Sequence, residues 1–409
     1  MEYGLIGEHL SHSFSKLIHE SIESYKYDLV ELAPNELESF LMKRDFKAIN
    51  VTIPYKQDVI PYLDEISESA KEVGAVNIIV NRNGRLCGYN SDVDGFIYLL
   101  DRAGISVKNK NILILGTGGA YKAIRYALDK LGAKSVLVAS RSKKPCYISY
   151  SELSQHPEVE VVINATPVGM YPHNEESIGF IDELPNLEGY VDIIYNPINT
   201  KNVIECSLKG IKAIGGLYML IYQAIRSIEI FLDKKINESV VDDIYKKIKR
   251  EHSNIVLIGM PTSGKSRIAK MLSKKLNIKY LDTDEEIEKE INMSIREYFE
   301  NFGEKSFRKL ETKVVERIYK DSPMVISTGG GIIKNIDNIK MLKQNGKIIF
   351  INRPLSQLFA SKDRPLSSNI GDLRKLYEER LPIYKKYADY EIYNDHGDLD
   401  RVVKEILEL

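Results

Sequence analysis

The sequence predicts an α/β protein throughout, and two glycine-rich segments are the main reason. Short apolar runs alternate with helical stretches along the chain, which is the pattern of strands and helices in α/β domains. A glycine turn at residues 116–120 follows the apolar run Asn111–Leu115, and a longer glycine loop at residues 259–266 follows Asn254–Ile258. A glycine-rich turn between a strand and a helix is typical of phosphate binding. We therefore expect two nucleotide sites, the first for a dinucleotide and the second for a nucleoside triphosphate.

The size and charge of the chain narrow the possible functions. The chain has 409 residues, enough for two or three domains, and its 57 Lys and Arg nearly balance its 58 Asp and Glu. This balance gives no reason to expect nucleic acid or an anionic membrane as a partner, so any anionic ligand must be bound by local groups. No apolar run approaches the roughly 18 residues of a membrane span. The separated cysteines predict neither a disulfide framework nor a zinc site, so we expect a cytoplasmic protein of undetermined oligomeric state.

The first half of the chain contains two groups of predicted elements. Residues 1–100 carry three apolar runs and one helical stretch, at Tyr3–Ile6, Ala48–Ile53, Val76–Val80 and Asn35–Lys43. Residues 101–217 predict a Rossmann-like unit in which one helix, Ala120–Leu131, follows the glycine turn. Its strands are expected at Asn111–Leu115, Ser135–Ala139, Val159–Asn164 and Tyr190–Ile194.

The glycine turn predicts a pyrophosphate site. Glycine lets the backbone approach the phosphates, and the N-terminus of the next helix supplies unpaired N–H groups and a partial positive charge. The residues expected to contact the cofactor are Gly116, Gly118, Gly119 and Ala120. Arg141 follows the next predicted strand with no acid nearby, which favours the 2′-phosphate of NADP over the free hydroxyl of NAD. The alternative is that Arg141 is an ordinary surface arginine.

Lys56 and Asp92 are candidates for proton transfer. Reduction of a ketone requires a group that gives up a proton as the alkoxide forms, and a lysine beside a carboxylate can do this. Lys56 comes just after a predicted strand, and Asp92 follows Gly88-Tyr89-Asn90-Ser91. Taken separately, such residues are more often a surface lysine and a turn aspartate. The hypothesis therefore depends on the neighbouring motifs.

Several separated motifs give residues 1–236 a resemblance to shikimate dehydrogenases. Besides the glycine turn, they lie at Ser11–Ser15, Asn50–Lys56, Gly74–Asn77, Asn90–Gly95, Asn164–Met170 and Gly215–Gln223. The resemblance implies a substrate-binding domain at residues 1–100, completed by helices around 218–236, and a Rossmann-like NADP-binding domain at residues 101–217. It implies Lys56 and Asp92 as the catalytic pair. It also implies that the substrate is bound by Ser13, Ser15, Thr52, Asn77, Tyr195 and Gln223, and that NADP(H) is approached by Thr166, Gly215 and Met219.

The C-terminal unit begins with the most specific motif of the chain. Residues 237–253 predict a charged helical linker, and residues 254–409 follow as a separate domain. Its loop, Gly259-Met260-Pro261-Thr262-Ser263-Gly264-Lys265-Ser266, has the spacing of a P-loop. Backbone N–H groups around Gly259 and Gly264 would surround the phosphates of ATP, Lys265 would reach the outer phosphates, and Ser266 would bind Mg²⁺. We expect a P-loop kinase domain with a parallel sheet.

Residues after the P-loop indicate what accepts the phosphoryl group. Asp282 and Asp284 end an apparent strand, and strand alternation predicts both acids on one face, one for Mg²⁺ and one for a substrate hydroxyl. The alternative is that they cap the following helix. Arg308 and Glu311 lie three apart on a predicted helix, so the acid can hold the arginine in place for a carboxylate ligand. The glycines 329–331, after the predicted strand Met324–Ser327, let the backbone approach a ligand.

Together with Arg364-Pro365-Leu366 and Arg380–Tyr384, these motifs resemble shikimate kinases over residues 254 to about 395. The resemblance implies that Asp284 orients the attacking hydroxyl of shikimate and that Asp282 and Ser266 support Mg²⁺. Lys265 and Arg364 would stabilise the transferring phosphoryl group. The carboxylate would be held by Arg308, Arg380 and the backbone around Gly330. Thr262 departs from the family pattern, which usually has a glycine at this position.

The two resemblances imply a bifunctional enzyme of the pathway to chorismate and the aromatic amino acids. NADPH-dependent reduction of 3-dehydroshikimate would give shikimate, and ATP-dependent phosphorylation would give shikimate 3-phosphate, so one half makes the substrate of the other. Two alternatives stay open. The C-terminal half could be a silent nucleotide-binding module that regulates the dehydrogenase, or the first half could act mainly on quinate with NAD.

Overall fold

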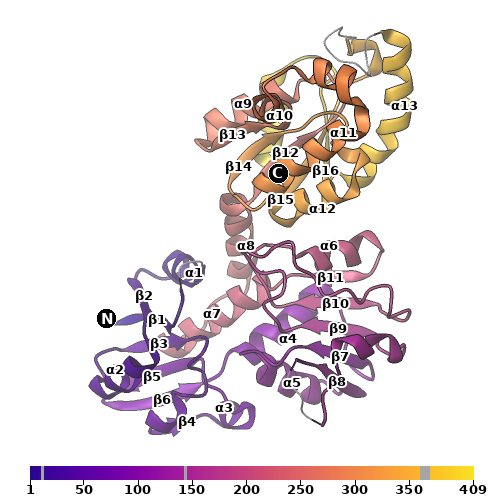
Figure 1. The fold of residues 1–409 in the computed structure, drawn as a ribbon. Coiled ribbons are helices and arrows are strands. Elements are labelled where there is room, and N and C mark those ends of the chain that lie inside the picture. Colours follow the sequence, from indigo (N-terminus) through magenta and orange to yellow (C-terminus); the bar gives the residue numbers. More distant parts are fainter. Residues whose placement is uncertain (11–12, 142–144, 360–368) are drawn as a thin grey trace. The chain divides into compact units, whose positions relative to one another are not determined.

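The computed structural model of the chain describes residues 1–10, 13–141, 145–359 and 369–409 (Figure 1). The chain folds into two compact units, Met1–Lys247 and Ile248–Leu409. The first unit contains two β-sheets and the second contains one, each with accompanying helices. This arrangement confirms the predicted α/β fold class.

Six strands form the first sheet, namely β1 (Tyr3–Gly7), β2 (Tyr27–Glu31), β3 (Ala48–Val51), β4 (Glu65–Ile66), β5 (Ile78–Arg82) and β6 (Arg85–Tyr89). Their order is β2-β1-β3-β5-β6-β4, with β5 antiparallel to both of its neighbours. The accompanying helices are α1 (Ser15–Ile22), α2 (Leu37–Lys43) and α3 (Glu68–Val73). Strand β3 is shorter than predicted because the chain turns at Thr52, whose carbonyl accepts the N–H of Tyr55 at 3.0 Å. Lys56 follows this turn.

Five parallel strands form the second sheet, namely β7 (Asn111–Leu115), β8 (Ser135–Ala139), β9 (Val161–Asn164), β10 (Gly189–Asp192) and β11 (Lys212–Ile214). The order β11-β10-β9-β7-β8 brings the ends of β7 and β9 together. The neighbouring helices are α4 (Asp92–Ala103), α5 (Tyr121–Lys130), α6 (Lys201–Leu208) and α7 (Leu217–Leu232). Because α7 packs against both α4 and α1, its residues reach the first sheet as well as the second.

Five parallel strands also form the third sheet, namely β12 (Asn254–Ile258), β13 (Lys279–Asp282), β14 (Met324–Ser327), β15 (Gly346–Asn352) and β16 (Tyr390–Tyr393). Their order is β13-β14-β12-β15-β16, so the P-loop after β12 lies between the ends of β14 and β15. The helices of this unit are α9 (Lys265–Leu276), α10 (Thr283–Ile291), α11 (Ile295–Ile318), α12 (Ile336–Asn345), α13 (Ile370–Tyr387) and α14 (Leu399–Glu408). Gly303 interrupts α11 with non-helical backbone angles, φ 74° and ψ 169°.

Helix α8 (Ser239–His252) occupies most of the segment predicted to be a charged helical linker. Its apolar residues recur at helical spacing, and the side chains of Val241, Ile244 and Ile248 are buried. Lys247 donates a hydrogen bond to the Ser21 hydroxyl at 2.9 Å. The segment is therefore an amphipathic packed helix, and only part of it presents a solvated face.

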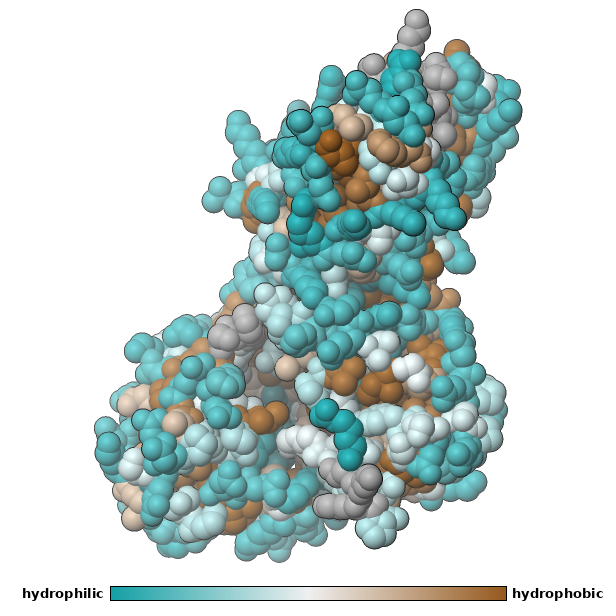
Figure 2. All heavy atoms as spheres, viewed as in Figure 1, coloured by the Kyte–Doolittle hydropathy of each residue, from teal (hydrophilic) through white to brown (hydrophobic). Residues whose placement is uncertain are grey.

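Hydrophilic residues dominate the face of the molecule drawn in Figure 2, and apolar side chains appear there in small separate patches. The apolar cores lie on the faces of the sheets, for example Ile112 and Ile163 on one face of the second sheet and Leu113 and Val162 on the other. Among the helices of the described ranges, none combines the length and the apolar character needed to cross a membrane.

Candidate active sites

Lys56 and Asp92 form an ion pair in the first unit. The Lys56 Nζ and Asp92 Oδ2 lie 2.6 Å apart, and their side chains are 13% and 3% exposed. Asp92 begins α4, and its backbone N–H donates to Asn90 Oδ1 at 3.0 Å, which fixes the start of the helix. A largely buried pair of this kind can transfer a proton to a substrate oxygen, because both groups are shielded from water.

Asn77 connects this pair to two further residues. Its Nδ2 donates to Asp92 Oδ1 at 3.0 Å and to Ser91 Oγ at 3.1 Å, and it lies 3.4 Å from Gln223 Oε1. Its Oδ1 accepts the N–H of Ser91 at 2.8 Å. The structure thus brings together residues preceding β5, at the start of α4 and on α7. The contribution of Ser91 was not foreseen from the sequence, although it lies inside a motif that carries the resemblance.

The remaining candidate substrate ligands of this unit lie on separate segments. Ser13 Oγ is 3.0 Å from Ser15 Oγ at the start of α1, and Thr52 directly follows β3. The ring of Tyr195 packs against that of Phe14, with centroids 5.6 Å apart. In the described ranges no hydrogen bond joins these four candidates to Lys56, Asp92 or Asn77.

The glycine turn after β7 lies close to neighbouring segments of the chain. Gly116 has a φ of 86°, and a Cβ built on it would lie 2.4 Å from the Thr166 side chain. A Cβ on Gly118 would lie 2.8 Å from the Ala165 carbonyl oxygen, and one on Gly119 would lie 2.8 Å from Ile53. Ala120 precedes α5 and provides no side-chain cap. The N–H of Tyr121 donates to the Gly118 carbonyl oxygen at 3.0 Å, so the turn offers an anion the partial positive charge of the helix N-terminus.

Thr166 is held beside the glycine turn by a buried polar network. Asn164 Oδ1 accepts both the N–H and the hydroxyl of Thr166, at 3.0 and 2.6 Å. Asn164 Nδ2 in turn donates to both carboxylate oxygens of Asp192, at 3.1 and 3.2 Å. Burial raises the pKa of Asp192 to about 6, and hydrogen bonds from Thr200, Ile194 and Tyr190 oppose that rise. The sequence did not predict the supporting role of either Asn164 or Asp192.

The other candidate cofactor residues lie on three elements around the second sheet. Gly215 follows β11, and a Cβ on it would lie 2.4 Å from the Ile198 carbonyl oxygen. Met219 is buried on α7, and its carbonyl oxygen would lie 2.8 Å from a Cβ on Gly95 of α4. Arg141 follows β8 and is exposed. The two lysines that follow it in the sequence, at 143 and 144, lie outside the described residues.

The P-loop connects β12 to α9 and encloses the Lys265 ammonium. Gly259 and Gly264 have φ angles of 149° and 98°, which favour glycine. Lys265 Nζ donates to the carbonyls of Gly259 and Met260 at 3.0 and 2.9 Å, and the residue is 6% exposed. The loop therefore has the compact form in which backbone N–H groups and a lysine can meet phosphate oxygens.

Ser266 and Asp282 form the candidate metal site, but the predicted strand geometry of the two acids is wrong. Ser266 Oγ donates to Asp282 Oδ2 at 2.7 Å, and Ser266 Oγ also lies 3.2 Å from Ser327 Oγ. Strand β13 ends at Asp282, whose Oδ1 accepts the N–H of Asp284 at 3.0 Å and caps α10. Asp284 consequently lies in the first helical turn, where strand alternation does not apply. A Cβ on Gly329 would lie 2.5 Å from Asp284 Oδ1, so this carboxylate faces the triple glycine.

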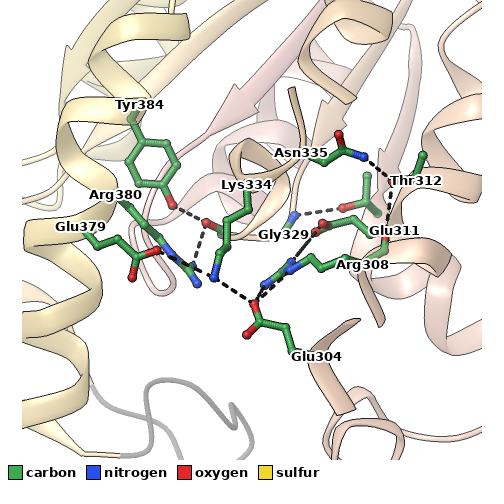
Figure 3. Close-up of polar contacts among 12 residues, drawn as sticks. Glu304, Arg308, Glu311, Thr312, Gly329, Lys334, Asn335, Glu379, Arg380 and Tyr384 are labelled. Atoms are coloured by element: carbon green, nitrogen blue, oxygen red, sulfur yellow. Dashed lines mark hydrogen bonds and ion pairs between the residues drawn. The ribbon is translucent and has the colours of Figure 1, made fainter. Parts of the chain in front are cut away.

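Arg308 is fixed between two glutamates on α11 (Figure 3). Its Nη1 donates to both carboxylate oxygens of Glu311, at 3.1 and 3.0 Å, which confirms the predicted pair. Its Nη2 and Nε donate to Glu304 Oε1 at 3.1 and 3.3 Å, and Lys334 Nζ donates to the same oxygen at 3.2 Å. Burial raises the pKa of Glu311 to about 7, against the opposing effect of Arg308. A Cβ on Gly331 would lie 2.2 Å from Arg308 Nη2, so a larger residue there would displace the guanidinium.

Arg380 approaches the same region from α13, with Lys334 between it and Arg308 in Figure 3. Its Nη1 donates to the Gly330 carbonyl oxygen at 2.9 Å, and the hydroxyl of Tyr384 donates to that oxygen at 2.5 Å. The residue is 2% exposed, yet within the described ranges its Nε and Nη2 have no hydrogen-bond partner. Two adjacent unpaired donors of a buried arginine match the two oxygens of a carboxylate. The sequence assigned no role to Glu304 or Lys334, and none to Tyr384, although Tyr384 ends one of the motifs that carry the resemblance.

The last candidate residue of the kinase part, Arg364, lies outside the described residues. The chain is described up to Phe359 and again from Asn369, where α13 is capped by the Asn369 side chain. The described candidates nevertheless converge around the P-loop, because Gly330 packs against Pro261, with a built Cβ 2.9 Å from Pro261 Cδ.

Comparison with known proteins identifies both parts of the chain. The family profile described as the shikimate dehydrogenase substrate binding domain matches residues 5–79. Among curated relatives, the shikimate dehydrogenase (NADP(+)) of Clostridium perfringens is 35% identical over 271 residues, which span 60% of this chain and 98% of the relative. The chain belongs to the shikimate dehydrogenase family. A second profile, described as shikimate kinase, matches residues 261–409, so this dehydrogenase also carries a shikimate kinase domain. The chain is therefore an enzyme of the shikimate pathway.

Solved structures support the assignment of the dehydrogenase part. The shikimate dehydrogenase of Peptoclostridium difficile is 37% identical and covers 61% of this chain and 98% of its own, with a TM-score of 0.56. A quinate dehydrogenase from Corynebacterium glutamicum, solved with NAD, is 25% identical and covers 60% of this chain and 99% of its own, with a TM-score of 0.54. The same fold thus occurs in proteins named for two substrates.

Proposed function

We propose that the chain is bifunctional: it reduces 3-dehydroshikimate to shikimate with NADPH and then phosphorylates shikimate to shikimate 3-phosphate with ATP. Family membership and the Lys56–Asp92 pair, at 2.6 Å, support the first activity. The kinase profile and the unpaired donors of Arg380 support the second. The Arg380 observation carries the proposal for the acceptor, since its two free donors fit the carboxylate that the kinase profile leads us to expect.

In the proposed reduction, the ammonium of Lys56 gives its proton to the carbonyl oxygen of the substrate. Bound NADPH supplies the hydride to the carbonyl carbon. Asp92 stabilises the charged lysine before transfer, and Asn77 holds the other carboxylate oxygen, so the ammonium stays directed at one position. The substrate carboxylate and hydroxyls are bound by Ser13, Ser15, Thr52, Asn77 and Gln223, with Tyr195 packing beside them.

The turn after β7 fits the pyrophosphate of NADP(H). A Cβ at Gly116, Gly118 or Gly119 would lie 2.8 Å or less from a neighbouring residue, and the N-terminus of α5 supplies a partial positive charge. Ala120 completes this turn, and Thr166, Gly215 and Met219 line the approach to the nicotinamide. Arg141, exposed after β8, pairs with the 2′-phosphate.

In the proposed phosphorylation, Asp284 orients the attacking hydroxyl of shikimate and accepts its proton. Lys265 and the backbone at Gly259 and Gly264 hold the ATP phosphates. Ser266 and Asp282 fit Mg²⁺, which commonly uses one or two protein ligands and completes its shell with water and phosphate oxygens. Arg308, Arg380 and the backbone around Gly330 bind the carboxylate. Arg364, outside the described residues, stabilises the transferring phosphoryl group.

The decisive experiment supplies full-length protein with ATP, Mg²⁺ and shikimate and measures shikimate 3-phosphate. The matched control is the Lys265→Ala variant, in which dehydrogenase activity should persist because Lys265 belongs to the other compact unit. Product formation by the unaltered protein alone supports the proposal. Product at the level of the Lys265→Ala control would instead favour a silent nucleotide-binding module that regulates the dehydrogenase.

A second candidate for the first half is a dehydrogenase that acts mainly on quinate with NAD. The likeness to the quinate dehydrogenase from Corynebacterium glutamicum is the observation that favours it. Initial rates with the four combinations of shikimate or quinate and NADP or NAD distinguish the candidates. We expect the highest kcat/KM with shikimate and NADP, and an Arg141→Ala variant should lose part of its preference for NADP. A preference for NAD in the unaltered protein would refute the role of Arg141.

A further inference from the structure

Thr262 has a backbone conformation that threonine rarely adopts. Its φ is 62°, in the left-handed region, where a β-branched side chain is an outlier. Gly264, two residues later, is also left-handed, with a φ of 98°. Left-handed residues in a loop of this kind turn successive N–H groups toward one side, which creates a concave site for an anion. The conformation of Thr262 is therefore part of the phosphate-binding geometry. Because threonine does not adopt this conformation as easily as glycine does, a specific contact has to maintain it.

The Thr262 hydroxyl contacts a segment 97 residues later in the chain. Thr262 Oγ1 accepts the N–H of Phe359 at 3.1 Å. The same hydroxyl lies 2.6 Å from the Pro261 carbonyl oxygen and 3.3 Å from the Phe359 carbonyl oxygen, and it can donate a hydrogen bond to either oxygen. One side chain thus connects the P-loop to the chain after β15.

Packing of the Phe359 side chain does not account for this connection, although the preceding residue, Leu358, is buried in the apolar core. The ring of Phe359 is 65% exposed, so the residue contributes little apolar burial that could fix its position. The Arg353 guanidinium lies 5.9 Å from the centre of this ring, a contact within the same segment. Among the described residues, the hydrogen bonds between Phe359 and the P-loop all pass through the Thr262 hydroxyl.

We propose that Thr262 is a positioning residue of the nucleotide site: its hydroxyl holds the P-loop in its left-handed, phosphate-binding form by bonding the loop to Phe359. This inference rests on the proposed nucleotide site and deepens it. A glycine at position 262 would adopt the same φ easily but would also adopt many others, so the loop would have to be ordered each time a nucleotide binds. With Thr262, whose hydroxyl both accepts and donates a hydrogen bond, the loop is already ordered before the nucleotide binds.

The test compares three variants of the full-length protein, Thr262→Ser, Thr262→Val and Thr262→Gly. Calorimetry measures the binding of ADP with Mg²⁺, which does not depend on phosphoryl transfer. The valine variant keeps the β-branched shape but lacks the hydroxyl, so we expect about tenfold weaker ADP binding and a similar rise in KM for ATP. The serine variant should bind ADP within about twofold of the unaltered protein.

The glycine variant separates backbone freedom from the hydroxyl contact. We expect intermediate ADP affinity, about threefold weaker, with a more unfavourable binding entropy. In all three variants the KM for shikimate and the rate of 3-dehydroshikimate reduction should stay unchanged, which would not hold if the substitutions merely disturbed folding. If the valine variant does not fold, the contrast between serine and glycine decides.

Two results would overturn the inference: ADP binding by the valine variant equal to that of the unaltered protein, or tighter binding by the glycine variant. The second result would show that threonine only strains the loop. The variants could show the expected ADP affinities while the unaltered protein phosphorylates no shikimate. In that case the proposed kinase activity fails, but the role of Thr262 in a nucleotide site stands.

Discussion

The two candidate sites differ in how the hydrogen-bond donors of their charged side chains are paired. In the dehydrogenase part, the Lys56 ammonium has one hydrogen-bond partner among the described residues, Asp92, which Asn77 holds by its other oxygen. In the kinase domain, Arg308 is bound by two glutamates, whereas Nε and Nη2 of Arg380 have no partner in the described ranges. A group that transfers a proton needs a partner that holds it in position, and a group that binds an anion needs free donors. The contrast favours proton transfer at Lys56 and carboxylate binding at Arg380.

The largest effect is expected from removing the proton donor. Lys56→Ala should lower kcat for 3-dehydroshikimate reduction by about 10³-fold, since general acid catalysis is worth roughly 10² to 10⁴. Phosphorylation of shikimate should remain near normal, because Lys56 and the P-loop belong to different compact units. Steady-state kinetics of both reactions on one preparation measure the difference.

Lys47→Ala is the matched control, because Lys47 also forms an ion pair in the first unit, with Glu2 at 2.9 Å, but is 61% exposed. It should leave both reactions unchanged. Equal losses of reduction and phosphorylation in Lys56→Ala would show that the halves are not independent. A near-normal kcat for reduction would remove Lys56 from the mechanism.

The second effect tests carboxylate binding. Arg380→Ala removes two donors that are free to bind an anion, and charge-assisted hydrogen bonds contribute roughly 1.5–3 kcal/mol each, so the KM for shikimate should rise by about 100-fold or more. The KM for ATP should change little. The control is Arg317→Ala, a half-exposed arginine of the same unit that pairs with Glu286 and Glu290. An equal rise in both KM values would indicate a general disturbance of the domain and contradict the assignment.

The sequence predicts the elements around the two loops well. Strands β7, β8, β12 and β14 have the predicted bounds, because a short buried apolar run bounded by glycine or polar residues is a strong local signal. Asp284 was placed wrongly because strand alternation contains no information about where a helix begins. The carboxylate of Asp282 decides that point by accepting the Asp284 N–H.

Contacts between distant segments could not be predicted in the same way. Asn77 joins residues of the loop before β5, of α4 and of α7, and no local periodicity encodes this meeting. Whether the donors of Arg380 are free depends on which acceptors lie near it, and this is known only from the folded structure. The family resemblance supplied the names of these residues, and their geometry came from the structure.

A smaller effect is expected from a substitution that moves Arg308 without removing it. The Cβ of Gly331→Ala would come within 2.2 Å of Arg308 Nη2, so the guanidinium has to shift. We expect about a tenfold rise in the KM for shikimate, because a small misplacement of a binding group is costly. A double-mutant cycle checks the cause: in the Arg308→Ala background, Gly331→Ala should add nothing further. Additive effects would show that Gly331 acts through the backbone approach alone.

The smallest effect concerns pH and sharpens the difference between the two arginines. Burial raises the pKa of Glu311 to about 7, so this group gains a proton as the pH falls from about 8 to about 6. Protonation changes the net charge of the Arg308–Glu311 pair from zero to +1, which attracts a carboxylate, so shikimate should bind more tightly at the lower pH. The expected change is about fivefold, as for a partly screened charge near a protein surface.

Glu311→Gln keeps an acceptor for Arg308 but cannot titrate, so its shikimate affinity, measured by calorimetry, should be nearly independent of pH over this range. Glu286→Gln serves as the control, because Glu286 pairs with Arg317 and Lys289 in the same unit and should leave the pH dependence intact. A Glu311→Gln variant with the slope of the unaltered protein would place the titrating group elsewhere. Weaker binding at the lower pH in the unaltered protein would reverse the sign and show that the deprotonated Glu311 is needed to orient Arg308.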